Sequence, residues 1–116
     1  MSQTKPNNQI DYAELPAIDI ARTKEFFTTV FGWKFEDYGP DYTSFFDGRL
    51  GGGFSRQKPA PATGILLVIY ASDLAATREK IKAAGGTIIK ETFSFPGGRR
   101  FHFADPSGNE LAVWSE

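Results

Sequence analysis

The chain contains the same sequence pattern twice. Shifted by 54 residues, the segment DIARTKEFFTTVFGWKFED, which begins at Asp19, aligns without a gap with DLAATREKIKAAGGTIIKE, which begins at Asp73. The identical pairs are Asp19/Asp73, Ala21/Ala75, Thr23/Thr77, Glu25/Glu79 and Gly32/Gly86. Self-similarity at a fixed period predicts two copies of one structural unit.

Each copy predicts one amphipathic helix. Asp19 and Asp73 stand where a side-chain oxygen accepts hydrogen bonds from the first free N–H groups of a helix. Gly32 and the Gly85–Gly86 pair follow as helix stops that tolerate a positive φ. Apolar residues recur between these signals at helical spacing, namely Ile20, Phe27 and Val30 in the first copy and Leu74, Ile81 and Ala84 in the second.

Extended segments surround each helix. IDYAELPA and GILLVIYA precede the helices, and the alternating segments WKFEDY, YTSFF, TIIKETF and RRFHFA follow them. We therefore expect an α+β fold with two tandem βαβββ modules in one domain, residues 1–116. Module one covers about residues 8–57 and module two about residues 64–116. The stretch RQKPAPATG, rich in proline and small residues, predicts a linker at about 57–63.

Composition excludes several classes of function. A chain of 116 residues builds one core, and its net charge of −1 comes from mixed acids and bases with no basic stripe for nucleic acid. The longest apolar stretch, Gly64 to Ala71, is too short to span a membrane, and the first ten residues lack the apolar core of a signal peptide. Cysteine is absent, which excludes disulfides and thiolate chemistry. We expect a cytoplasmic protein with neither nucleic-acid nor membrane partners.

The segment HFADPSGN contains the single histidine, His102, and predicts a tight hairpin. The Asp105 carboxylate can accept from the backbone two residues on, Pro106 fixes φ, and Gly108 takes the special conformation. Asp47-Gly48 stands at the corresponding corner of module one, so we expect Asp105 to be structural.

Two motifs carry a family resemblance. ELPAIDIARTKEFFTTVFGWKFED, followed much later by FADPSGNELAVW, resembles the vicinal oxygen chelate superfamily, which includes glyoxalase I, extradiol dioxygenases and bleomycin-resistance proteins. The likeness runs from about Ile10 to Trp114. It implies curved mixed sheets that enclose a cavity, often at a dimer interface, and in many members a divalent metal. A homodimer is therefore expected.

The resemblance also places the family's metal ligands. The histidine of the first strand falls here on Tyr12, that of the second module on Leu66, and the C-terminal glutamate on Ala112. The fourth position lies around residues 52–54, a segment without carboxylate or histidine. Because zinc or nickel sites need about three or four N, O or S ligands, we expect no metal cofactor.

Strand alternation predicts which side chains face the cavity. Residues of the same parity as the three ligand positions are Tyr12 and Glu14, Leu66, Val68 and Tyr70, and Glu110, Ala112 and Trp114. The expected ligand-binding residues are Tyr12, Glu14, Phe54, Leu66, Val68, Tyr70, His102, Ala112 and Trp114. This aromatic and apolar wall suits a flat or amphipathic organic ligand better than a hard cation.

Glu14 is the expected catalytic residue if the protein is an enzyme, because a carboxylate in an apolar strand needs a partner or a task. The alternatives are pairing with Arg99, Arg100 or Tyr70, or exposure to solvent near the strand end. Tyr12 and Trp114 contact a ligand or only fill the core. For His102 the alternatives are ligand contact and a purely structural position, since no catalytic triad is evident.

Three functions follow from these alternatives. The first is a protein that binds a small aromatic or amphipathic molecule without the family's metal, like bleomycin-resistance proteins. The second is a lyase or isomerase similar to glyoxalase, dependent on metal or on Glu14 as the base. The third is an interaction subunit whose cavity is filled by its own side chains. Fold alone does not decide among them.

Overall fold

A computed structural model describes residues 6–56 and 64–116, so the expected linker at about 57–63 lies outside the described residues. The elements repeat one order, β-α-β-β-β, as the sequence predicts. In the first repeat they are β1 (Gln9–Pro16), α1 (Ile20–Phe31), β2 (Lys34–Asp37), β3 (Tyr42–Phe46) and β4 (Gly51–Ser55). In the second they are β5 (Leu66–Tyr70), α2 (Leu74–Ala83), β6 (Thr87–Phe95), β7 (Gly98–Ala104) and β8 (Glu110–Ser115).

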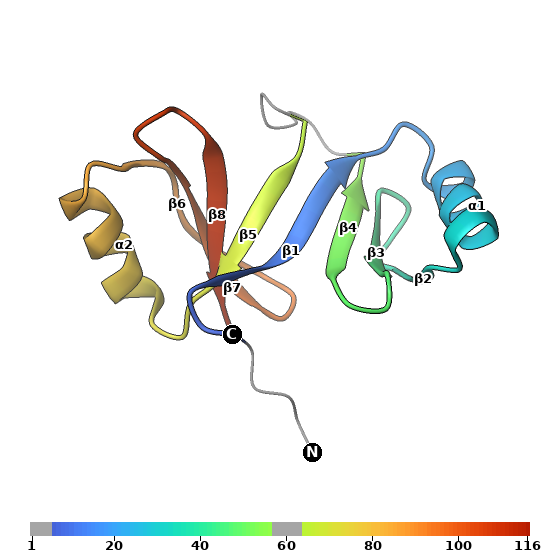
Figure 1. The fold of residues 1–116 in the computed structure, drawn as a ribbon, viewed down its shortest axis with the longest axis horizontal. Helices are drawn as coiled ribbons and strands as arrows, with labels where there is room; N and C mark the ends of the chain where they lie inside the picture. The colour runs from blue at the N-terminus through green and yellow to red at the C-terminus, as the bar shows by residue number, and fades with distance from the viewer. Residues whose placement is uncertain (1–5, 57–63) are drawn as a thin grey trace, which may run out of the picture. The chain divides into compact units, whose positions relative to one another are not determined.

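The chain groups into two compact units. The first unit is Tyr12–Leu66, and the second unit is Leu67–Glu116 together with the N-terminal segment up to Asp11. Figure 1 shows each helix beside the strands of its own unit. Within the described residues, neither helix is long and apolar enough to cross a membrane.

In the first unit the strand order is β2-β3-β4-β1. The β1–β4 pair is parallel and the other neighbours are antiparallel, which gives the expected mixed sheet. Helix α1 packs on one face through Phe27, whose ring stacks on Trp33 at 4.5 Å and on Phe54 at 5.3 Å between centroids. Phe45 extends this aromatic core, with centroids 4.7 Å from Trp33.

The ends of α1 follow the predicted signals. The Asp19 side chain accepts a hydrogen bond from the Arg22 amide, and Gly32 ends the helix in the left-handed region with φ of 74°. The expected apolar faces were wrong at two positions. Ala84 is exposed and follows the last residue of α2. Val30 in α1 is 55% exposed. It follows Phe26 by four residues, so both side chains share the outer side of the helix while Phe27 faces the sheet.

In the second unit the strand order is β5-β8-β7-β6. The β5–β8 pair is parallel and the other two pairs are antiparallel. Helix α2 covers one face, where Leu74 and Ile81 pack with buried strand residues, chiefly Phe101, Phe103 and Val113. Because side chains alternate along a strand, Arg100, His102 and Ala104 lie on the opposite face.

The turns of the second unit also agree with the sequence. Asp73 caps α2 by accepting from the Ala76 amide. Asp105 accepts hydrogen bonds from the amides of Ser107 and Asn109, both at 2.9 Å, and Gly108 has φ of 89°. Asp47 does the same for Arg49 and Leu50 in the first unit. Asp105 therefore has the structural role that was expected.

Candidate functional site

The helix-free face of the second unit gathers five of the residues predicted to bind a ligand. Two rows of cross-strand neighbours run over it. Val68 on β5 pairs with Ala112 on β8, which pairs with His102 on β7. In the adjacent row Tyr70 pairs with Trp114, and Trp114 pairs with Arg100. We call the set Val68, Tyr70, His102, Ala112 and Trp114 the β5–β8–β7 face.

Aromatic rings form one side of the β5–β8–β7 face. The Trp114 ring lies edge-on to Tyr70 at 5.2 Å and is 6.2 Å from Phe95. The Trp114 indole N–H donates to the Asp11 carboxylate at 3.2 Å, and the Tyr70 hydroxyl donates to Glu116 at 2.6 Å. The Glu116 contact, followed by burial, raises the pKa of Tyr70. The polar groups of Trp114 and Tyr70 are thus hydrogen-bonded to carboxylates, while their rings pack against each other.

His102 forms the other side of the β5–β8–β7 face. Its residue is 8% exposed, and its Nδ1 lies 2.9 Å from Oε2 of Glu110. Its Nε2 is buried and has no hydrogen-bond partner in the described structure. Burial lowers the pKa of His102, and the hydrogen bond to Glu110 opposes this effect. The alternation of side chains along the last strand predicted that Glu110 lies on this face, but the sequence did not reveal its hydrogen bond with His102.

The first unit holds a hydrogen-bonded network on its own helix-free face. The Tyr42 hydroxyl donates to Oε2 of Glu14 at 3.1 Å, and the hydroxyl groups of Tyr12 and Tyr42 are hydrogen-bonded to each other. Burial, then the neighbouring Tyr12 and Glu14, raise the pKa of Tyr42, so this phenol stays protonated. Tyr12 and Glu14 were predicted from the sequence, whereas Tyr42 was missed, because its place beside Glu14 depends on the register between β3, β4 and β1.

The glycine run of β4 makes room for these side chains. A Cβ at Gly53 would lie 1.9 Å from the Tyr42 hydroxyl oxygen and 2.7 Å from that of Tyr12. A Cβ at Gly52 would lie 2.3 Å from the Phe45 ring on the other face. All three distances are shorter than non-bonded contacts allow, so the glycine run shapes both faces of the sheet.

Two predicted residues stand apart from this network. Phe54 is 4% exposed and pairs with Leu15 and Thr43, one position out of phase with Glu14, so it faces α1. The structure therefore separates Phe54 from Tyr12 and Glu14. Leu66, the first residue of β5, is 1% exposed.

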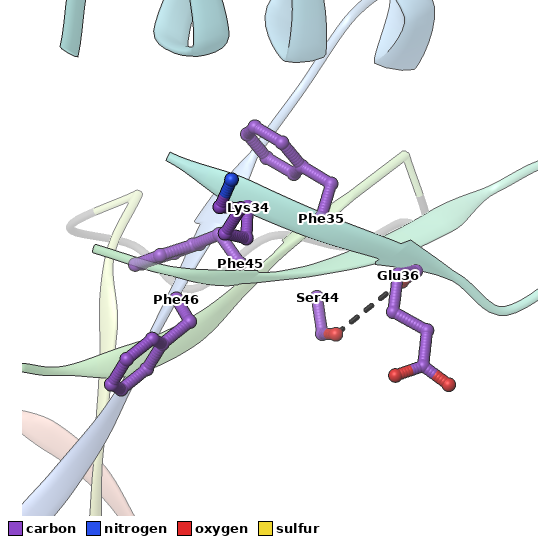
Figure 2. A pocket seen from close by; sticks show the side chains of 6 residues that line it. All are labelled: Lys34, Phe35, Glu36, Ser44, Phe45 and Phe46. Carbon is purple, nitrogen blue, oxygen red and sulfur yellow. Dashed lines mark hydrogen bonds between the residues drawn. The ribbon is translucent and has the colours of Figure 1, made fainter. Parts of the chain in front are cut away.

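Strands β2 and β3 border a hollow of about 170 Å³. Figure 2 shows Glu36, Ser44 and Phe46 on one side of these strands and Phe35 on the other. The Ser44 hydroxyl donates to the Glu36 carbonyl at 3.3 Å. This hollow has room for about one small ring, but it contains none of the residues predicted from the sequence.

The residues present do not fit the divalent metal that the resemblance implies. Leu66 and Ala112, which stand at two of its ligand positions, carry only hydrocarbon side chains and are 1% and 0% exposed. Across residues 6–56 and 64–116, no three His, Cys, Asp or Glu side chains lie close enough together to hold a metal ion. Hydrocarbon groups donate no electron pair to a cation.

Comparison with known proteins decides the family. The profile described as Glyoxalase/Bleomycin resistance protein/Dioxygenase superfamily matches residues 9–113. The chain belongs to this superfamily. The resemblance drawn from the two motifs is therefore confirmed.

Relatives within the superfamily differ in length. The anthracycline biosynthesis proteins DauV of Streptomyces sp. (strain C5) and DnrV of Streptomyces peucetius are each 33% identical over 87% of this chain. The chain spans only 44% of their length. A glyoxylase-like domain-containing protein of Didymella fabae is 28% identical, with 92% of this chain and 93% of that protein aligned.

Two solved structures share the fold at low identity. Protein BH1468 of Bacillus halodurans C-125 has a TM-score of 0.75 at 13% identity over 93% of this chain and 94% of that one. The Mn(II)-bound glyoxalase of Novosphingobium aromaticivorans has a TM-score of 0.70 at 21% identity over 94% of this chain and 39% of that one. These similarities confirm the α+β fold class, and they concern the fold alone.

Proposed function

We propose that this superfamily member binds a planar aromatic or amphipathic small molecule on the β5–β8–β7 face without a metal ion. One observation carries the proposal: Val68, Ala112, His102, Tyr70 and Trp114 occupy two adjacent rows of cross-strand neighbours on the face opposite α2. Rings that present faces and edges, with a few polar groups among apolar neighbours, are typical of sites for flat organic ligands.

The names of two relatives support an aromatic ligand. DauV and DnrV are named for anthracycline biosynthesis, and anthracyclines are flat, hydroxylated polycyclic aromatics. Their greater length leaves the whole-protein activity outside this proposal. From these two relatives the proposal takes only the class of ligand, an aromatic molecule.

Trp114 gives a direct test. In a Trp33→Phe background it is the sole tryptophan, because the sequence has two. We expect hydroxyanthraquinones to quench its fluorescence with saturation at micromolar to millimolar concentrations. Calorimetry should show at least a tenfold loss of affinity in Trp114→Leu and little change in Phe46→Ala, whose ring lies in the first unit. If a broad panel of aromatic ligands leaves both the fluorescence and the calorimetric heat unchanged, the proposal fails.

A second candidate function is proton transfer by Glu14, and the Tyr12–Tyr42–Glu14 network favours it. A carboxylate that accepts from a phenol is held in place and is a candidate general base. Glu14→Gln should abolish any isomerase or lyase activity found with glyoxalase-type substrates. Full activity in that variant would remove Glu14 from the reaction.

A further inference from the structure

His102 and Glu110 form a carboxylate–imidazole pair on the β5–β8–β7 face. An ionised carboxylate only accepts hydrogen bonds, so the 2.9 Å contact with Glu110 assigns the ring proton to Nδ1 of His102. The neutral imidazole then presents a lone pair at Nε2. A carboxylate that fixes the imidazole tautomer in this way leaves the second nitrogen oriented as a proton acceptor.

The acceptor at Nε2 is buried and unsatisfied. No described group donates a hydrogen bond to it. Leaving a buried polar atom without a partner is unfavourable, and such atoms in native proteins call for an explanation such as a bound ligand. A ligand with a hydroxyl group would supply the missing donor.

Two cationic side chains accompany His102. Lys90 is its cross-strand partner on β6, and Arg100 lies two residues before it on the same face of β7. After burial, both positive charges act to lower the pKa of His102, whereas Glu110 raises it. The imidazole therefore starts neutral, and cations stand where they would stabilise an anion formed beside it.

Phe93 covers this group. Its ring centroid lies 5.8 Å from that of His102, and the Lys90 ammonium lies 4.3 Å from the same ring. Phe93 comes from β6, the last strand in its unit's order, whose pairing shifts register between Ile88 and Lys90 and again between Lys90 and Phe93. An irregular outer strand holds its side chains less firmly than a regular central one. A ligand that contacts His102 would also meet the Phe93 ring.

Building on the proposed function, we propose that the ligand is a phenol or enol and that His102 removes its acidic proton. The O–H bond breaks, the electron pair stays on oxygen, and the proton forms a new N–H bond at Nε2. The imidazolium is stabilised by Glu110, and the oxyanion is bound by Lys90 and Arg100. No oxidant, reductant or further reactant is needed. Glu110 is a positioning residue in this step.

A nitrophenol tests the proton transfer, because its phenolate absorbs at longer wavelength than the phenol. We expect bound nitrophenol to ionise at least about one pH unit lower than free nitrophenol, a tenfold preference for the phenolate. His102→Gln should abolish this spectral shift, and Glu110→Gln should reduce it. Lys90→Gln changes an exposed side chain and gives an independent readout if His102→Gln fails to fold.

The corresponding nitroanisole, which has no acidic proton, serves as the matched ligand. The unmodified protein should bind nitroanisole, as measured by Trp114 fluorescence in the Trp33→Phe background, with an absorbance spectrum that does not change with pH. Nitrophenol that binds with an unchanged absorbance spectrum would overturn the proton transfer and leave the proposed function intact. Failure of both ligands to bind, together with the hydroxyanthraquinones, would instead overturn the proposed function itself.

Discussion

Gly53 has only a hydrogen atom in place of a side chain, and this leaves room for the hydroxyl groups of Tyr12 and Tyr42. Alternation predicted Tyr12 and Glu14 on one face, because parity along a strand is local information. It did not reveal the partner of Glu14, which comes from β3 and depends on the register between β3, β4 and β1. The same limit hid the pairing of His102 with Glu110. Contacts set by register between strands were therefore the part that sequence could not predict.

Substitution at Gly53 tests this arrangement. A Cβ 1.9 Å from the Tyr42 oxygen forces that side chain to move, so Gly53→Ala should destabilise the protein by about 1–3 kcal/mol. Gly51→Ala is the matched control, since its new Cβ would meet only the Phe45 carbonyl oxygen at 3.8 Å. Urea unfolding measures both variants. Equal stability of the two would contradict the packing described for Gly53.

His102 makes stability depend on pH. Its folded pKa lies below the unfolded value of about 6.5, so the unfolded chain binds the proton first as pH falls. The free energy of unfolding should therefore decrease between pH 6.5 and the lower folded pKa. His102→Gln should lack this contribution. The free energy of unfolding of each protein is measured by urea unfolding from about pH 7.5 to 5.5. Subtracting one from the other removes the contribution of the carboxylates that both proteins share. A difference that stays constant would contradict a buried neutral imidazole.

At the scale of elements, the helices could be predicted most completely. Asp19, Asp73 and Gly32 act within one turn of the backbone they cap, so their signals need no tertiary information. Gly85 has a positive φ of 100° as expected, whereas Gly86 avoids the Ile81 side chain, which a Cβ would meet at 2.5 Å. The register shifts of β6 had no such signal, because they depend on how an outer strand follows the twist of β7.

Helix α1 offers a matched pair of aromatic residues. Phe27 stacks on Trp33 and Phe54, whereas Phe26 is 55% exposed. Phe27→Ala should lower the free energy of unfolding by about 2–4 kcal/mol and Phe26→Ala by under about 1 kcal/mol. Thermal and urea unfolding both report the difference. Comparable losses in the two variants would mean that the outer side of α1 is covered by something other than water.

At the scale of the whole molecule, the repeat and its two motifs were enough to predict fold and superfamily. The homodimer stays a prediction, because a single chain does not show which surface a second copy would cover. The ligand class is a proposal, because the ligand is a separate molecule that the sequence does not describe. Local patterns specify a framework, whereas recognition is specified by a few side chains that the framework brings together.

Native mass spectrometry of protein purified without chelator tests dimer and metal together. We expect a species of twice the 12.8 kDa chain mass that carries no stoichiometric divalent metal. The control is the same protein incubated with excess Zn²⁺ or Mn²⁺ and then desalted, which should return to the metal-free mass. One bound metal ion per chain would contradict the conclusion that the site containing Leu66 and Ala112 does not fit a metal.

The second unit is discontinuous along the chain, and this has a consequence for synthesis. The Asn8 amide donates to the Tyr70 carbonyl, and the Asp11 carboxylate accepts from Trp114, 103 residues later. A ribosome delivers residues in order at about 5–20 per second, so Tyr12–Leu66 is complete long before Trp114 exists. Until then the contact between Asp11 and Trp114 cannot form, although Tyr70, which accepts from the Asn8 amide, is already present. The contact between Asp11 and Trp114 is therefore among the last native contacts of this unit to form during synthesis.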